Sequence, residues 1–277
     1  MKVTFIGPGK MAKLIASRAV VSGFCEGAEI CFASGRKIEI GKKRQLTKMF
    51  PGCRIADSNR AAVYGADLII LAVRPDDLAD AASDLKGQLT DSQTVISIIT
   101  GKSLAALSEA LGAKNVVRCC TNIAIEIGFA TTLWKALRGT SREALTLAGS
   151  AFKNWGSARE IIKESVLNVG MVAVGSLPAL YLEIFGAVER GLVTHGMSHD
   201  DAKFCAMSVM GGTHQLCASR DGLAWSEIQK EVLTPGGITV EMLLVADRGA
   251  LRAIIIDALG AAVAKTLKLG QDKGGKN

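Results

Sequence analysis

The stretch FIGPGKMA, residues 5–12, fits the pattern G-x-G-x-x-A and decides how the first half of the chain is interpreted. Val3 to Ile6 is a short β-branched and aromatic run that predicts a strand, and helical spacing of apolar residues runs from Met11 to Gly23. A glycine turn between a strand and a helix is typical of dinucleotide sites, where the helix N-terminus binds a pyrophosphate. The stretch therefore predicts a phosphate-binding turn.

Further strands alternate with helical patterns after this turn. They are expected at residues 29–33, 67–73, 94–99 and 115–119. Such alternation indicates a doubly wound parallel sheet, whereas beyond about residue 160 only long helical patterns follow. The prediction is an α/β Rossmann-type domain over residues 1–160 and an all-α domain over residues 161–277, with a frayed tail at 273–277.

The composition limits the classes of protein to which the chain can belong. Of its 277 residues 49% are hydrophobic and 21% charged, which is typical of a globular chain with a large core. The net charge of +7 is scattered and lacks interleaved aromatic residues, so nucleic-acid binding is not expected. The longest uncharged apolar stretch, residues 169–182, is short for a membrane span, and seven cysteines without a C-x-x-C pattern indicate a reducing cytoplasm.

The end of the second predicted strand bears on which dinucleotide is bound. An NAD site needs an acid there for the ribose hydroxyls, but the sequence is Ser34-Gly35-Arg36-Lys37. A hydroxyl and two cations suit a 2′-phosphate, so NADP(H) is favoured over NAD(H). The alternative is that Arg36 and Lys37 only begin an exposed basic helix.

Two features of the helical half were considered as sites. His195 and His199 are four residues apart, but Gly196 and a capping serine at 198 suggest that they flank a turn, so no metal is expected. The run 233–239, Leu-Thr-Pro-Gly-Gly-Ile-Thr, leads into a helix. Its free N–H groups and two threonine hydroxyls could bind a carboxylate, or it could be an ordinary turn between helices.

These motifs together resemble the pyrroline-5-carboxylate reductase family, nearly end to end. FIGPGKMA looks like the family's FIGAGNMA, and LAVRP at 71–75 looks like its LAVKP. The stretch from Val116, VVRCCTNIAIEIG, resembles VxRxMPNTPxxVG, and LTPGGITVEML resembles TSPGGTTxxxL. The resemblance implies a Rossmann domain, a helical domain that forms a homodimer and sometimes larger assemblies, and NAD(P)H-dependent reduction of a cyclic imine.

The resemblance also implies roles for individual residues. Those implied to bind the cofactor are Gly7, Pro8, Gly9, Lys10, Met11, Ser34, Arg36, Asn59, Ala72, Val73, Arg74 and Pro75. Those implied to bind the substrate are Asn122, Thr234, Gly236, Gly237 and Thr239. Thr239 stands where the family hydrogen-bonds the ring nitrogen, and it is the candidate catalytic residue.

Several positions depart from the family pattern. Ala124 replaces a proline, and Val174, Leu177 and Leu180 replace a serine, a glycine and a tyrosine. These changes are expected to make the substrate pocket more apolar. The expected reaction is reduction of 1-pyrroline-5-carboxylate to L-proline with NADPH. A paralogue reducing another imine or a 2-keto acid, and a non-catalytic NADP-binding sensor, are the alternatives.

Overall fold

The computed structural model describes residues 1–271, so the tail at 273–277 that was expected to fray lies outside the described residues. The chain forms two compact units. One contains Met1–Ser176 and the C-terminal segment from Val263, and the other contains Leu177–Ala262. The domain boundary expected at residue 160 stays a prediction, although the last strand does end at Glu160.

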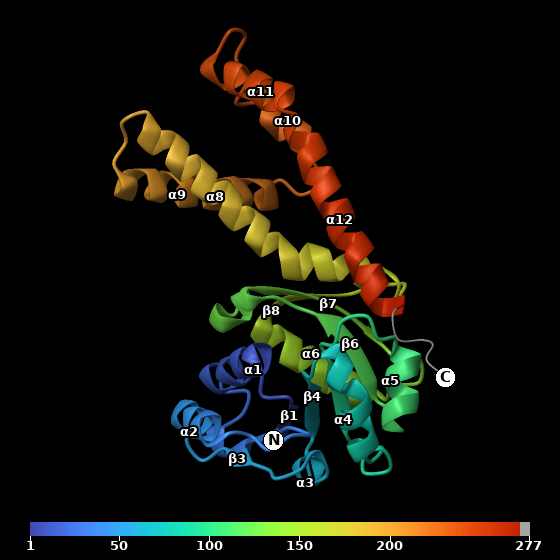
Figure 1. Ribbon diagram of the computed structural model, residues 1–277. Helices are drawn as coiled ribbons and strands as arrows, with labels where there is room; N and C mark the ends of the chain where they lie inside the picture. The colour runs from blue at the N-terminus through green and yellow to red at the C-terminus, as the bar shows by residue number, and fades with distance from the viewer. Residues whose placement is uncertain (272–277) are drawn as a thin grey trace. The chain divides into compact units, whose positions relative to one another are not determined.

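The first unit is built on an eight-stranded sheet of order β3-β2-β1-β4-β5-β6-β7-β8 (Figure 1). The strands are β1 (Val3–Ile6), β2 (Ile30–Ala33), β3 (Arg54–Ile55), β4 (Leu68–Leu71), β5 (Thr94–Ser97), β6 (Val116–Cys120), β7 (Ala130–Ala136) and β8 (Gly156–Glu160). β1 pairs in parallel with both β2 and β4, which places its C-terminal end where the order of the chain reverses. Open α/β sheets bind ligands at such a point.

The five strands expected from sequence are confirmed, but the sheet is not wholly parallel. β7 runs antiparallel to β6, with Cys119 opposite Trp134. β7 follows β6 after nine residues, fewer than the dozen or more that a parallel crossover needs, so the connection favours antiparallel pairing. β3 is two residues long and β8 is mostly exposed and polar, so neither carries the apolar run by which strands are recognised.

Helices cover both faces of this sheet, each over its own apolar core. One face packs on α1 (Lys10–Val21), α2 (Ile40–Met49) and α6 (Arg142–Trp155), around Phe5 and Phe152. The other packs on α3 (Asn59–Val63), α4 (Leu78–Leu85) and α5 (Leu104–Leu111), around Ile69 and Leu107. Because the central strands are buried on both faces, their sequences are mostly apolar, and β4 is entirely so.

All seven cysteines are free thiols. Burial is the main cause that raises the pKa of Cys25 and of Cys120 to about 11. These thiols therefore stay protonated near neutral pH and pack as small apolar groups, as predicted for the adjacent pair Cys119 and Cys120.

One long apolar helix runs from Val166 to Thr194 through α7 (Val166–Gly170), a π-helical segment (Met171–Ser176) and α8 (Leu177–Thr194). Pro178 lacks an N–H group and would interrupt a regular helix, and the π-helical segment ends two residues before it. The helix is therefore longer than the apolar stretch 169–182 suggested. By length and composition alone it could cross a membrane, but only 11% of its most apolar window is buried within the chain.

The second unit is helical as predicted, with α8 packed against α9 (His199–Ser219). Ser198 caps α9 and Gly196 has a φ of +97°, so His195 and His199 do flank a turn. α10 (Trp225–Lys230), α11 (Ile238–Arg248) and α12 (Leu251–Gln271) complete the helices. In the described part of the chain, no group of three or more His, Cys, Asp or Glu side chains is arranged to bind a metal ion.

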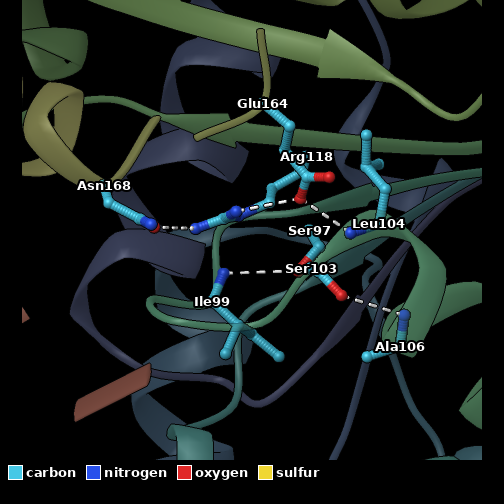
Figure 2. Close-up of polar contacts among 8 residues, drawn as sticks. All are labelled: Ser97, Ile99, Ser103, Leu104, Ala106, Arg118, Glu164 and Asn168. Carbon is cyan, nitrogen blue, oxygen red and sulfur yellow. Dashed lines mark hydrogen bonds and ion pairs between the residues drawn. The ribbon is translucent and has the colours of Figure 1, made fainter. Parts of the chain in front are cut away.

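A buried arginine fastens the start of the long helix to the sheet (Figure 2). Arg118 of β6 donates to Glu164 Oε1 at 2.9 Å and to Asn168 Oδ1 at 3.0 Å. Glu164 Oε1 also accepts from the backbone N–H of Leu104 at 2.7 Å, the first residue of α5. Three segments distant in sequence thus meet at the Glu164 carboxylate, and the side chain of Arg118, which binds it, is only 5% exposed.

We expect Arg118→Met to lower the free energy of unfolding of the first unit by about 2 kcal/mol, because the change leaves a partly buried carboxylate without its cation. Lys114→Met is the matched control, since its ion pair with Asp91 is about three-quarters exposed and should contribute little. Urea unfolding followed by tryptophan fluorescence measures both. Equal losses in the two variants would contradict a special role for Arg118.

Candidate dinucleotide-binding site

The glycine turn lies at the C-terminal end of β1, and Gly7 is required there for two reasons. Its φ of +92° is unfavourable for other residues, and a Cβ at this position would stand 2.8 Å from the carbonyl oxygen of Ala72. The backbone after β1 thus touches the backbone after β4. Gly9 differs, because its φ is −80° and a Cβ there would meet nothing nearer than 4.0 Å. The protein itself leaves room for a side chain at residue 9.

Helix α1 begins at this turn with an uncapped N-terminus. No side chain caps it, its first turn contains no acidic residue, and no backbone hydrogen bond within the described chain occupies the N–H groups of Lys10 and Met11. Free N–H groups and the helix dipole attract an anion. The open space at Gly9 lets a phosphate come close to these groups.

A cavity of about 580 Å³ opens beside the turn. The predicted cofactor residues that line it are Gly7, Pro8, Gly9, Ser34, Arg36, Ala72, Val73 and Arg74. Those that do not line it are Lys10, Met11, Asn59 and Pro75. Pro75 instead begins a 3-10 helix (η2, Pro75–Asp77), as expected for a proline at a first helical position. The loops after β1, β2 and β4 thus bring most of the predicted residues into one cavity.

Asn59 lies beneath the loop that follows β2. It is completely buried, and its Nδ2 donates to Asp84 Oδ2 at 3.0 Å, which fixes the orientation of the amide. Its Oδ1 is the one buried side-chain oxygen or nitrogen of the described residues that has no hydrogen-bond partner. A Cβ on Gly35 would stand 3.5 Å from Asn59 Nδ2. Because Asn59 is completely buried and does not line the cavity, its role in binding a cofactor stays a prediction.

Four charged side chains of the cavity were not predicted from the sequence. Glu39 and Lys42 come from the start of α2, and Asp77 and Asp80 come from the start of α4. Asp77 Oδ1 lies 3.3 Å from Arg36 Nη2. Attention to the acid-rich run that follows Pro75 could have identified the last two, because a helix after β4 must begin at the same edge of the sheet.

The Pro-Gly-Gly loop lies in the second compact unit and opens α11. Gly236 has a φ of +68°, and a Cβ on Gly237 would stand 2.9 Å from the carbonyl oxygen of Thr234, so the loop needs both glycines. Gly237 precedes the helix and forms no side-chain cap, and the N–H groups of Ile238 and Thr239 have no partner within the described residues. Thr239 is the second residue of α11, so it does not cap the helix.

Asn122 has a local partner. Its Oδ1 accepts from the N–H of Ala124 at 3.1 Å and caps a 3-10 helix (η3, Ile123–Ile127) after β6. A proline at 124 would have no N–H group to donate.

Val174 is 3% exposed and packs with Cys120 and Leu167 in a small core, whereas Leu177 and Leu180 are only partly buried. Val174 is therefore a packing residue in this structure.

Comparison with known proteins agrees with this geometry. A family model described as NADP oxidoreductase, coenzyme F420-dependent, matches residues 2–101, and the model for pyrroline-5-carboxylate reductase dimerisation matches residues 164–269. Pyrroline-5-carboxylate reductase of Thermus thermophilus is 29% identical over 99% of this chain and 100% of its own length. The reductase of Methanosarcina acetivorans is 28% identical over 98% of each chain.

Solved structures show the same fold. Plasmodium falciparum pyrroline carboxylate reductase, solved with NADP bound, has a TM-score of 0.85 at 20% identity, with 98% of each chain covered. The Coxiella burnetii enzyme has a TM-score of 0.82 at 24% identity, covering 97% of this chain and 98% of its own. The N-terminal part is an NADP-binding domain and the helical part a dimerisation domain. The chain is an NAD(P)-dependent oxidoreductase and belongs to the pyrroline-5-carboxylate reductase family.

Proposed function

We propose that the protein reduces 1-pyrroline-5-carboxylate, a cyclic imine that carries a carboxylate, to L-proline and prefers NADPH to NADH. The observation that carries this proposal is the Pro-Gly-Gly loop of the region matched by the dimerisation model, whose free N–H groups at α11 suit a carboxylate. Relatives that align along nearly the whole chain are named for this substrate. Arg36 and Ser34 support the choice of NADPH.

In this proposal the first unit binds the cofactor and the second unit binds the substrate. The N–H groups of Lys10 and Met11 hold the pyrophosphate, Arg36 and Ser34 hold the 2′-phosphate, and Asn59 is assigned to the adenine ribose. Ala72, Val73, Arg74 and Pro75 are assigned to the cofactor cleft. When bound, the reduced nicotinamide supplies a hydride to the imine carbon.

The residues proposed to bind the substrate orient the imine and stabilise its charged groups. Thr234, Gly236 and Gly237 shape the loop that binds the carboxylate, and the Thr239 hydroxyl hydrogen-bonds the imine nitrogen. Asn122 is a further substrate contact, although its Oδ1 is shared with Ala124. A protonated imine already accepts a hydride readily, so orientation and exclusion of water suffice and no strong general acid is needed.

We further infer that the protein is a cytoplasmic homodimer, and that dimers can assemble further. The long helix leaves large apolar side chains exposed, among them Val169 at 51% and Leu182 at 63%. Exposed apolar surface of this kind is typical of subunit interfaces. An interface helix and a membrane helix can share this composition, and the dimerisation match over residues 164–269 favours the interface.

One observation favours a second candidate substrate class. Leu177 and Leu180 give the start of α8 more apolar surface than the family pattern does, which would suit a different imine or a 2-keto acid. Purified protein with NADPH and a panel of cyclic imines and 2-keto acids, followed at the nicotinamide absorbance, tests the proposal. Fastest turnover with 1-pyrroline-5-carboxylate supports it, and faster turnover with another compound overturns it. No oxidation of NADPH with any compound would favour a sensor.

Thr239→Val is expected to lower kcat about ten- to a hundredfold, because loss of the hydroxyl removes a hydrogen bond worth roughly 1 to 3 kcal/mol in a water-poor site. Thr146→Val, which removes an exposed hydroxyl on α6, is the control and should leave kcat unchanged. The affinity for NADPH should stay the same in both variants. Unaltered kcat with a lowered melting temperature would show that Thr239 serves stability alone.

Light scattering at micromolar concentration is expected to give at least twice the chain mass of 29.0 kDa. Leu182→Glu should shift the population toward monomer, because a charge cannot be buried in an apolar interface without a partner. Val21→Glu, at a 73% exposed position on α1, is the control and should not change the mass. A single 29 kDa species for the unaltered protein would exclude the proposed dimer.

A further inference from the structure

Residues 34–38, directly after β2, contain no acid, yet a carboxylate does reach them from the segment that follows another strand. Asp77 follows β4, and its Oδ1 lies 3.3 Å from Nη2 of Arg36, which follows β2. β1 lies between these two strands, so the ion pair joins the loops on either side of the glycine turn. Both residues line the cavity of about 580 Å³.

The charges around this cavity balance. Its cationic side chains are Arg36, Lys42 and Arg74, and its anionic side chains are Glu39, Asp77 and Asp80. Arg36 and Asp77 form the one ion pair among these described lining residues. A 2′-phosphate beside Arg36 would therefore also lie near the Asp77 carboxylate and be repelled by it.

We propose that Asp77 is a specificity-determining residue that weakens the preference for NADPH and allows NADH to bind. With NADPH, Arg36 leaves Asp77 for the 2′-phosphate. With NADH, Asp77 accepts the hydrogen bond from the ribose hydroxyl that an acid at the end of β2 usually accepts. The Arg36 side chain is 86% exposed and that of Asp77 40%, so exchanging partners needs little energy.

Two structural alternatives give Asp77 another task. It could cap α4, but it precedes that helix without a side-chain hydrogen bond to it. It could hold Arg36 ready for the 2′-phosphate, in which case its loss would weaken binding of NADP⁺. The two remaining roles therefore predict opposite changes in one measurement.

The proposal rests on the proposed use of a nicotinamide dinucleotide, and direct binding tests it without a substrate. Dissociation constants for NADP⁺, NAD⁺, 2′,5′-ADP and 5′-AMP are measured by calorimetry on the full chain. In Asp77→Asn, NADP⁺ and 2′,5′-ADP should bind about three- to tenfold more tightly, and NAD⁺ and 5′-AMP more weakly by a similar factor. Asp91→Asn is the control, because it removes the same charge from an exposed pair with Lys114 outside the cavity.

Arg36→Gln separates failure of this proposal from failure of the proposed function. Weaker NADP⁺ binding in Arg36→Gln with an unchanged or lower preference for NADP⁺ in Asp77→Asn would overturn the role of Asp77 and leave the function standing. No effect of Arg36→Gln on NADP⁺, or no binding of either dinucleotide by the unaltered protein, would overturn the proposed cofactor site itself. The proposal is supported if the preference for NADP⁺ over NAD⁺ rises in Asp77→Asn and stays unchanged in the control Asp91→Asn.

Discussion

The close approach of two backbones at Gly7 is the constraint on which the first unit depends. A Cβ at this position would stand 2.8 Å from the carbonyl oxygen of Ala72, so the ends of β1 and β4 can meet only because residue 7 has no side chain. β1 pairs with β4 on this side and with β2 on the other. Helix α1 begins directly after this turn, so its free N–H groups lie beside the cavity at the edge of the sheet.

Much of this arrangement could be predicted from the sequence, because the glycine turn and the apolar strands are local features. β1, β4 and the capped start of α9 lie where the sequence predicted them. β7 and β8 were missed because their pairing is set by tertiary contacts: β7 has a polar, half-exposed outer face, and β8 has no apolar residue larger than Ala158. The same limit explains why the sheet was expected to be wholly parallel.

In the candidate site, too, some residues could be predicted from the sequence and others could not. Residues on the glycine turn were predictable, since their spacing carries the chemistry. The partnership of Asp77 with Arg36 was not, because 41 positions separate two side chains that only the strand order brings together. Asn122 is a further case, in which the N–H of Ala124 gives a predicted ligand-binding side chain a partner within its own loop.

The open N-terminus of α1 has a consequence for the evolution of stability in this chain. A serine or aspartate at residue 9 would meet no steric obstacle and could cap the helix, which commonly stabilises a protein by about 1 kcal/mol. Such a side chain would occupy the space that an anion needs, so the gain in the free chain would be a loss in the complex. A ligand that binds the folded chain stabilises it by mass action, and a bound dinucleotide would serve as the missing cap. The thermal stability of the chain would therefore rise with the concentration of free dinucleotide, and not depend on the amino-acid sequence alone.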